Sequence, residues 1–363
     1  MSHMKNWILC SYILIIALFI SIQNSFSQIS YELESSKSLA VGNAIVATAE
    51  DDDALFGNPA GLVAFDGIKT SIHASYQNYS WKSLNIKQNY SQSGGAVAVI
   101  YNNWGLLFGR WQKGDKINEW TVVKNNSVYL QNAKFLYYEQ FINLCYSFKV
   151  APGLAVGLRG RYLASDVHDS YKDHFTGEYK GVVVDVGILW KYSEALKIGL
   201  NIDYLLSSKF KYFIFSDLGQ PVIAKTHPVS LDIGMQYKPI SKLLLSTQVK
   251  NVFTRKIEIE PLYKNENIEL RRSYHLGAEY RLFPCVTLRT GFIQQSYPID
   301  FSVSDNKEFY YMARKTYSFG IGFYLNSFIL DIAIAHDNRN DYLKLSGKED
   351  SINRYLLSLA FVY

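Results

Sequence analysis

Cysteine is scarce in this sequence, with 3 cysteines among 363 residues. Cys10 lies inside an apolar run near the N-terminus, which leaves Cys145 and Cys285 for the rest of the chain. Two cysteines so far apart do not make the disulfide framework of a small secreted domain, and we expect both to be free thiols. No group of cysteines and histidines has the spacing of a metal site, so we expect neither a metal nor a cofactor.

An excess of charge of one sign is also lacking, because 37 Lys and Arg stand against 32 Asp and Glu, a formal net charge of +5. Without the N-terminal segment and its single Lys5, 36 basic residues remain against 32 acidic ones, or +4. This small excess is scattered along the chain, whereas nucleic-acid-binding domains gather basic residues on one face. We therefore expect no nucleic acid among the partners.

A long hydrophobic run occurs at the N-terminus, where Lys5 precedes apolar residues from Trp7 to Ile22 and small and polar residues up to Ser27. This order is typical of a secretory signal peptide, which we predict at residues 1–27. The alternative is an N-terminal membrane anchor, because the run is only slightly shorter than a membrane span. The small residue at the position that a signal peptidase needs favours the signal peptide.

Helical periodicity is missing as well, because after about Gly67 no window keeps the i, i+3, i+4 spacing of apolar residues for long. Apolar and polar residues alternate instead, as in GVVVDVGILWKY, where every second residue from Val182 to Tyr192 is apolar and the other face carries Asp185 and Lys191. Such alternation is typical of strands. A soluble β-sandwich alternates in the same way, so this pattern alone does not place the apolar face in lipid.

Three further features favour a barrel that crosses a membrane. Segments such as KFLYYEQFINLCYSFKV are long for strands and suit a tilted crossing of about 9–11 residues with some overhang. Tyr, Phe and Trp gather at the ends of the segments, as interfacial aromatic girdles require. Short turns alternate with longer polar stretches, which is the arrangement of an outer-membrane barrel with its short turns in the periplasm.

The connections divide the chain into about 14 strands, an even number that lets an antiparallel up-and-down barrel close with both termini on the periplasmic side. We predict an all-β fold, with the barrel at residues 67–363, in the outer membrane of a Gram-negative bacterium. The predicted short turns lie near Asn103, Ala151, Ser193, Pro239, Phe283 and Leu325. The predicted strands are Ile68–Ser80, Gly95–Asn102, Trp104–Gln112, Lys134–Lys149, Gly153–Val167, Lys180–Tyr192, Ala195–Ser207, Thr226–Lys238, Lys242–Asn251, Arg271–Leu282, Val286–Gln295, Arg314–Tyr324, Phe328–His336 and Asn353–Tyr363.

The last predicted strand, NRYLLSLAFVY, places Phe361 and Tyr363 on its apolar face. It resembles the C-terminal signal by which bacterial barrel proteins are recognised for insertion. This implies the outer-membrane assembly machinery and outer-membrane lipid as partners. The alternative is an ordinary edge strand, which the terminal aromatic residue disfavours.

Charged residues of both signs lie on the faces opposite to the apolar ones and would line the lumen. Because mixed charges in a narrow lumen tend to pair with one another, we expect structural ion pairs rather than substrate contacts. His275 is the inward histidine of this set, and no Ser or Cys stands where it would complete a catalytic arrangement, so we expect no enzyme. These residues are Glu139, Arg159, Arg161, Asp185, Lys197, Asp203, Asp232, Lys250, His275, Glu279, Arg281, Arg289 and Asp331.

The stretch EDDDALFGNPAG lies between the predicted signal peptide and the first strand. Asp51, Asp52 and Asp53 carry oxygen ligands for a hard cation, but a contiguous triplet lacks the alternation of a calcium loop. We favour an interpretation in which they satisfy the amino end of a short helix or pair with the lumen arginines. Pro59 restricts Asn58 to extended geometry and ends any helix that begins at the aspartates.

The segment SSKSLAVGNAIVATAEDDDALFGNPAG resembles the N-terminal segment of the FadL and PorV superfamily of outer-membrane barrels. The resemblance continues more weakly along the barrel, in stretches such as HPVSLDIGMQYKP. It implies a 14-stranded barrel with residues 28–66 folded into the lumen as a plug, which the aspartates anchor. In the FadL branch it further implies passage of hydrophobic small molecules, such as fatty acids, that leave sideways through the wall. The matching residues are Ala40, Gly42, Asn43, Ala44, Asp51, Asp52, Asp53, Asn58, Pro59 and Ala60, followed by Gly61.

Two alternative functions stay open. The loops are short, and no apolar helical loop stands out that would capture a ligand, which makes the chain similar to the PorV and PorQ branch. The stretch from Ser75 to Trp111, with Trp81 in a predicted loop, also resembles that branch. Its members serve the type IX secretion system of Bacteroidetes as partners of translocon and cargo. The third possibility is a passive structural or diffusion barrel.

Overall fold

The computed structural model describes most of the chain from residue 34 onward. The predicted signal peptide at residues 1–27 and the first residues of the predicted plug lie outside the described part. Within that part, no helix has the length and hydropathy of a membrane span. The described residues are 34–83, 86–114, 118–124, 127–133, 135–169, 176–207, 223–224, 229–254, 257–260, 267–268, 272–300, 309–341 and 349–363.

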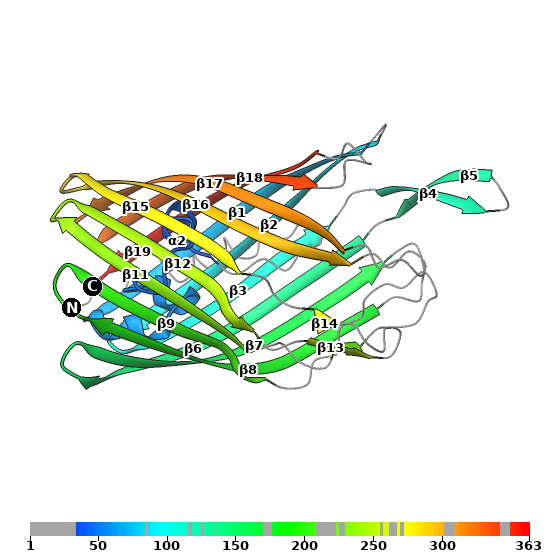
Figure 1. Ribbon diagram of the computed structural model, residues 1–363. Helices are drawn as coiled ribbons and strands as arrows, with labels where there is room; N and C mark the ends of the chain where they lie inside the picture. Colours follow the sequence, from blue (N-terminus) through cyan, green and yellow to red (C-terminus); the bar gives the residue numbers. More distant parts are fainter. Residues whose placement is uncertain are drawn as a thin grey trace, which may run out of the picture.

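Antiparallel strands close into one barrel of 14 strands (Figure 1). Each barrel strand pairs with the barrel strands before and after it, and the pairing of the first with the last closes the wall, so the connectivity is up-and-down. This confirms the predicted all-β fold class. The barrel strands are β1 (Ile68–Ser83), β2 (Ile86–Tyr101), β3 (Trp104–Gly114), β6 (Phe135–Ala151), β7 (Leu154–Asp169), β8 (Thr176–Lys191), β9 (Leu196–Ser207), β11 (Ser230–Ile240), β12 (Leu243–Thr254), β15 (Ser273–Phe283), β16 (Val286–Asp300), β17 (Phe309–Leu325), β18 (Phe328–Asp341) and β19 (Glu349–Val362).

Short turns join the strands at one end of the barrel, which we call the short-turn end. Asn102 and Asn326, with φ of 51° and 52°, form two of these turns at predicted positions. Asparagine tolerates this left-handed conformation better than most residues. The C-terminus also lies at this end (Figure 1), where the Tyr363 N–H donates to the Ile68 carbonyl at 2.8 Å.

At the opposite end, the prediction of long polar loops is wrong in part. The stretches from Trp81 to Ser93 and from Gly114 to Ala133 are largely strand. Backbone pairing does not require an apolar face, so the alternating pattern stops before the strand does. Additional strands also lie in the connections: the hairpin of β4 (Asn118–Lys124) and β5 (Ser127–Ala133), and a small sheet of β10 (Ile223–Ala224), β13 (Ile257–Glu260) and β14 (Asn267–Ile268).

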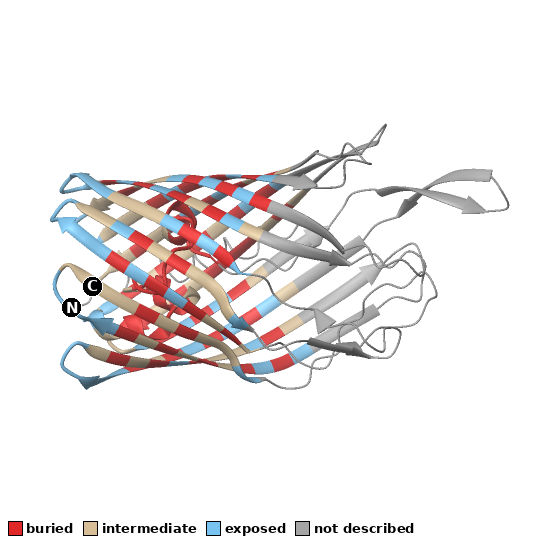
Figure 2. Ribbon diagram, in the orientation of Figure 1, coloured by how far each residue is buried: buried red, intermediate tan, exposed pale blue. Residues whose placement is uncertain are grey.

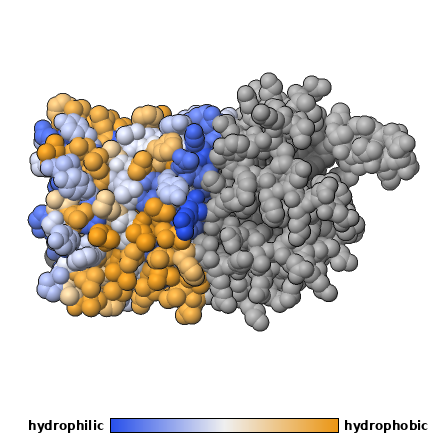
Figure 3. Space-filling model, viewed as in Figure 1, coloured by the Kyte–Doolittle hydropathy of each residue, from blue (hydrophilic) through white to orange (hydrophobic). Residues whose placement is uncertain are grey.

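Outward side chains form an apolar belt beside the short-turn end (Figure 3), and buried residues alternate with more exposed ones along the same strands (Figure 2). In β11, for example, Ile233, Met235 and Tyr237 point outward and are exposed, while the residues between them are buried. The belt ends at a border of outward polar residues, as the apolar band of a membrane barrel does. This polar border consists of Asn78, Arg110, Gln140, Lys180, Arg272, Gln294, Lys315, His336 and Asn353.

Two hairpins contain the same backbone irregularity. Tyr204 in β9 has a φ of 58°, and its N–H donates to Oδ1 of Asp185 on β8 at 2.9 Å. Asn251 in β12 has a φ of 54°, and its N–H donates to Oδ1 of Asp232 on β11, also at 2.9 Å. The pairing register shifts at both places. Each inward aspartate thus satisfies an N–H group that the bulge removes from the ladder.

Residues 34–66, which we call the inner segment, lie inside the barrel at its short-turn end (Figure 1). They form α2 (Ser36–Ala40), α3 (Asp53–Phe56) and the 3-10 helix η1 (Pro59–Ala64). Nearly all of the residues up to position 62 are buried or half-buried, and Leu55 has no exposed surface. The inner segment occupies the place expected of the plug, whereas its role in blocking passage stays a prediction.

Glycines of the wall lie directly beneath the inner segment. They occur as cross-strand pairs, and a Cβ atom at any of these positions would press on the inner segment. At Gly157, for example, it would overlap the backbone of Pro59 and Ala60. The absence of a side chain therefore lets two backbones approach closely. The pairs are Gly157–Gly187 on β7 and β8, Gly199–Gly234 on β9 and β11, and Gly277–Gly291 on β15 and β16.

Candidate functional site in the lumen

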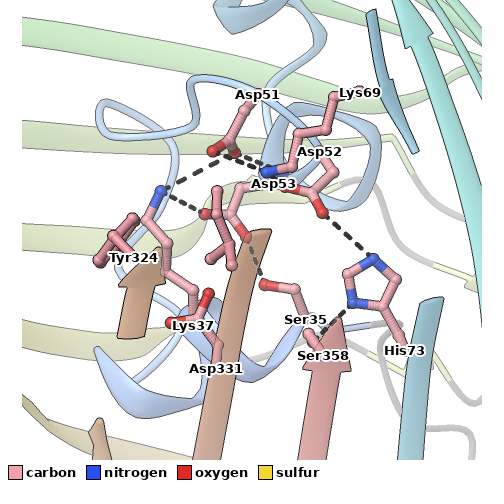
Figure 4. Close-up of a pocket in the computed structure, with 11 residues that line it drawn as sticks. Ser35, Lys37, Asp51, Asp52, Asp53, Lys69, His73, Tyr324, Asp331 and Ser358 are labelled. Atoms are coloured by element: carbon pink, nitrogen blue, oxygen red, sulfur yellow. Dashed lines mark hydrogen bonds and ion pairs between the residues drawn. The ribbon is translucent and has the colours of Figure 1, made fainter. Parts of the chain in front are cut away.

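The acidic triplet lies at a small cavity between the inner segment and strands β1, β17, β18 and β19 (Figure 4). Lys69 of β1 points into it, with Nζ 2.6 Å from Asp52 Oδ1 and 3.1 Å from Asp51 Oδ2. Lys37 of α2 lies with Nζ 2.9 Å from Asp53 Oδ2. Two ammonium groups, one from the wall and one from the inner segment, therefore hold the triplet.

His73 of β1 links this cluster to β19. Its Nε2 lies 3.3 Å from Asp52 Oδ2, and its Nδ1 lies 2.7 Å from Ser358 Oγ. The ring of Phe56, at the end of α3, packs edge-on against the imidazole with 5.0 Å between centroids. The histidine thus contacts both an acidic and an apolar residue of the inner segment.

The first two aspartates differ in their ionisation. Burial raises the pKa of Asp51 to about 7, because the positive charges of Lys37 and Lys69 only partly offset the loss of hydration. Burial also disfavours the charged form of Asp52, but the contacts with Lys69 and His73 outweigh it. They hold the pKa of Asp52 well below its ordinary value.

The prediction that lumen arginines pair with the triplet is wrong. Arg159 lies with Nε 2.7 Å from Asp185 Oδ2 and with Nη2 2.9 Å from Asp203, and Arg161 donates to Asp185 at 2.8 Å. Arg159 and Asp185 are directly opposed on β7 and β8, which brings them together within the wall. Arg159 also donates to the Gly57 carbonyl at 2.7 Å. It therefore binds the carboxyl end of α3, while Lys69 holds the amino end.

Other predicted lumen charges make the expected structural contacts. Arg289 pairs with Glu279 at 2.6 Å and with Asp331 at 2.5 Å. His275 lies with Nδ1 2.7 Å from the carbonyl oxygen of Gly42, which ties β15 to the inner segment. Arg289, Glu279, Asp331 and His275 thus all have partners within the described part of the chain.

The prediction for one lumen residue, Arg281, is wrong, and two others have structural roles. Arg281 lies exposed at the short-turn rim, because it comes just before the β15–β16 turn, where the wall ends. Asp232 is buried and holds the β12 bulge as described above. Lys197 pairs with Glu50 of the inner segment.

Several contacts between the inner segment and the wall were not predicted from the sequence. Arg354 of β19 lies 2.5 Å from Glu34 and 3.1 Å from Asp337 of β18. Lys69 was missed as well, although IKTSIHASYQ carries a signal. Every second residue from Lys69 to Gln77 is polar, which gives β1 a continuous polar inward face.

The Asn-Pro-Ala motif has a structural explanation. Asn58 caps η1, because its Oδ1 accepts a hydrogen bond from the Ala60 N–H at 3.1 Å. Its Nδ2 donates to the Ile188 carbonyl of β8 at 2.9 Å. A Cβ atom at Gly187 would overlap the Asn58 side chain, and one at Gly61 would overlap the inner segment's own backbone. The motif therefore seats the inner segment against the wall.

Inward side chains on β2, β3 and β6 are mostly apolar, and we call this part of the lumen its apolar side. Strands β2, β3, β6, β7 and β8 contribute inward side chains to one buried cluster with the inner segment, in which the Phe141 ring lies over Gly109. The lumen of a porin carries polar residues at such inward positions. The cluster contains Ala49, Ala54, Leu55, Leu62, Ala96, Ala98, Ile100, Leu107, Phe141, Cys145, Leu163 and Val183.

The triplet does not have the character of a metal site. Its carboxylate oxygens lie within 4.8 Å of one another, which would suit a hard cation by distance. Lys37 and Lys69 already contact these oxygens, however, and their positive charge opposes a further cation. The carboxylates of the triplet and the two lysines therefore hold the inner segment in place.

The C-terminal aromatic residues lie at the short-turn rim. Phe361 is half-buried and packs against Phe328, with 5.5 Å between ring centroids, and Tyr363 is exposed. Their place fits an aromatic girdle. Their role as an insertion signal stays a prediction.

The closed antiparallel barrel, its apolar outer belt and the N-terminal segment in its lumen together define a membrane β-barrel with an inner segment. No family model matches the chain, and no curated protein sequence matches it. Solved structures do. The chain is similar to the TodX deltaS2S3 mutant monoaromatic hydrocarbon channel, at a TM-score of 0.70 and 12% identity over 92% of this chain and 100% of that chain.

Two further structures are similar in the same way. The Pseudomonas putida toluene transporter TodX has a TM-score of 0.63 and 11% identity, over 93% of this chain and 99% of that chain. A Pseudomonas aeruginosa FadL homologue has a TM-score of 0.60 and 12% identity, over 93% of this chain and 100% of that chain. The chain therefore has the fold of a FadL-type barrel.

Proposed function

We propose that this chain is an outer-membrane transport protein that passes hydrophobic small molecules through its lumen. The apolar side of the lumen carries the proposal, because a pore for hydrophilic solutes would not line β2, β3 and β6 with a buried hydrophobic cluster. The similarity to barrels described as hydrocarbon channels supports it. An apolar solute is stabilised when it moves from water to such a surface.

The outer surface supports the proposed location. The apolar belt lies between the short-turn rim and the polar border, and lipid would cover it (Figure 3). Exposed aromatic residues at the rim, such as Trp104, Trp190 and Tyr192, suit the membrane interface. With the short turns in the periplasm, the C-terminus is periplasmic as well.

The inner segment is the proposed gate. It contacts the wall around most of its circumference, so a solute that leaves through the short-turn end must displace part of it. The contacts come from different strands and include hydrogen bonds and ion pairs. The wall residues are Lys69 of β1, Arg159 of β7, Lys197 of β9, Gln248 of β12, His275 of β15, Ser318 of β17 and Ser358 of β19.

A pair of matched substitutions tests the transport function. Ala98→Asp places a charge on the apolar side, and Ser75→Asp places the same charge at an inward, buried position of polar strand β1. We expect Ala98→Asp to reduce uptake of a radiolabelled hydrophobic probe, such as toluene or a fatty acid, at least tenfold more than Ser75→Asp, because the probe contacts the apolar side. Equal uptake by the two folded variants would overturn the proposal.

Bilayer conductance separates a gated barrel from a passive one. We expect conductance to rise when residues 34–65 are deleted, and to rise less when Asp51, Asp52 and Asp53 are replaced by Ala. Unchanged conductance in both would remove the gating role. The type IX secretion hypothesis stays a separate prediction, and unaffected secretion in a deletion strain would count against it.

A further inference from the structure

The charges at the short-turn end are distributed unevenly. Four consecutive turns, those after β6, β8, β11 and β15, carry exposed cationic side chains. The turns after β2 and β17, on the opposite part of the rim, have no charged residue, and exposed Asp66 precedes β1. We call the cationic part the basic rim, and it consists of Lys149, Lys191, Lys238, Lys242 and Arg281.

The basic rim lies at the mouth of the lumen rather than on the lipid-facing surface. Side chains alternate along a strand, and Ser147 and Gln236 are buried on the lumen side two residues before Lys149 and Lys238. The lysines therefore stand on the lumen-facing side of their strands, just beyond the wall. This position directs them toward whatever occupies the mouth.

Acidic residues do not neutralise the basic rim within the described part of the chain. Among its four turns the acidic residue is Glu194, which lies 2.5 Å from Lys191. A hydrogen bond from Lys191, together with the charges of Lys191, Lys197 and Lys238, lowers the pKa of Glu194. No salt bridge joins Lys149, Lys238, Lys242 or Arg281 to a described residue, so four cationic groups remain available to a partner.

The length of the basic rim favours an extended partner over a small one. Six steps between neighbouring strands separate β6 from β15. At about 4.8 Å a step the rim extends over roughly 30 Å. A single carboxylate or phosphate group reaches one or two of these side chains. An extended peptide of about nine or ten residues has the length to follow them all.

We propose that the basic rim binds an acidic, extended segment of a partner protein at the short-turn mouth of the barrel. In the proposed orientation this partner is periplasmic, and that compartment rests on the proposed function. The binding itself does not depend on it. The interaction is electrostatic, so it weakens as salt shortens the range of the attraction.

Binding of a fluorescein-labelled deca-glutamate peptide to the full chain, purified in an uncharged detergent, tests the proposal. The rim variant is Lys238→Glu with Lys242→Glu, and the matched control is Arg272→Glu with Lys315→Glu at the polar border, where both residues are exposed. Both make the same change in net charge. We expect the dissociation constant, measured by fluorescence anisotropy at low salt, to rise roughly tenfold more in the rim variant than in the control.

Further measurements distinguish the other outcomes. Lys238→Gln with Lys242→Gln, which adds no negative charge, should give a smaller loss of the same sign, and a deca-glutamine peptide should not bind. Equal loss in rim variant and control, or no binding of deca-glutamate at low salt, overturns the proposal. So does unchanged peptide binding together with loss of phosphatidylglycerol from nanodiscs, which would assign the rim to lipid headgroups.

Discussion

The two sides of the lumen hold the inner segment by different forces. On the polar side, Lys69 and Arg354 form ion pairs with Asp52 and Glu34. On the apolar side, strands β2, β3 and β6 pack alkyl and aromatic side chains against Leu55. Ion pairs lose strength when water and salt enter, whereas hydrophobic contacts lose strength when an apolar ligand replaces them. A hydrophobic solute is therefore expected to loosen the apolar side first, while the polar side keeps the segment attached.

Loss of Lys69, the lysine of the wall on the polar side, should give the largest decrease in stability. In Lys69→Ala, Asp51 and Asp52 lose their shared partner, and breaking a buried pair costs about 3–5 kcal/mol. We expect this loss in urea unfolding from lipid vesicles, together with faster proteolysis of the inner segment. Lys315→Ala, at an exposed position of the polar border, should change stability by less than about 0.5 kcal/mol. Equal effects would show that the polar side does not hold the segment.

Truncation on the apolar side should have a similar or slightly smaller effect with a different salt dependence. Leu55→Ala leaves a cavity at a position without exposed surface and should cost about 2–5 kcal/mol. Because no charge changes, the loss should be the same at low and high salt, whereas that of Lys69→Ala should decrease slightly as salt rises, since a buried pair is screened less than an exposed one. Leu288→Ala, on the exposed outer face, is the control. A salt-dependent loss in Leu55→Ala would contradict the division into two sides.

Added volume beneath the Asn-Pro-Ala motif should have a moderate effect. In Gly187→Ala the new methyl group overlaps the Asn58 side chain, and overpacking of this kind costs about 1–3 kcal/mol. Gly160 of the neighbouring strand has open space where a Cβ would stand, so Gly160→Ala should be neutral. Thermal unfolding of both variants compares the two faces of the wall. A neutral Gly187→Ala would mean that the inner segment is not seated there.

The pH dependence at Asp51 should be the smallest effect when it is compared over a single pH unit. Its pKa is about 7 in the folded protein against an ordinary 3.8, so between these values the folded state retains a proton that the unfolded state releases. Stability should therefore fall as pH rises through this range, by at most about 1.4 kcal/mol per pH unit. Asp51→Asn should flatten this slope, and Asp66→Asn, at an exposed position, should not. A slope unchanged in Asp51→Asn would contradict the assignment.

Much of the fold was predictable because lipid-facing strands leave a strict pattern. The segments around Val182 and Met235 alternate as the structure does, and the short turns near Asn103 and Leu325 are where they were expected. The far parts of the strands were not predictable, since polar residues in paired backbone leave no such pattern. β2, which begins at Ile86 rather than Gly95, shows the difference.

The inner segment's part of the candidate site was predictable from the sequence, but its partners on the wall were not. The triplet and Asn58 stand out in the sequence, and both contact the wall. Their partners on the wall lie far away in the sequence: Lys69 is 17 residues from Asp52, and Ile188 is 130 residues from Asn58. Only the closure of the barrel brings them together. The assignment of Arg281 to the lumen failed for another reason: its turn was expected at the right place, but alternation gives the face of a residue and not its depth along the barrel.

The sequence by itself determined which residues face outward, since a period of two and an apolar face leave little choice of register once lipid or a core covers one side. It also determined that the helix at the aspartates ends before Pro59, because proline fixes its own backbone and restricts Asn58 to an extended conformation. The tertiary structure alone decided that one side of the lumen is charged and the other apolar. That division depends on which strands stand opposite the inner segment, and strand order around a barrel is a property of closure, not of any single stretch of chain.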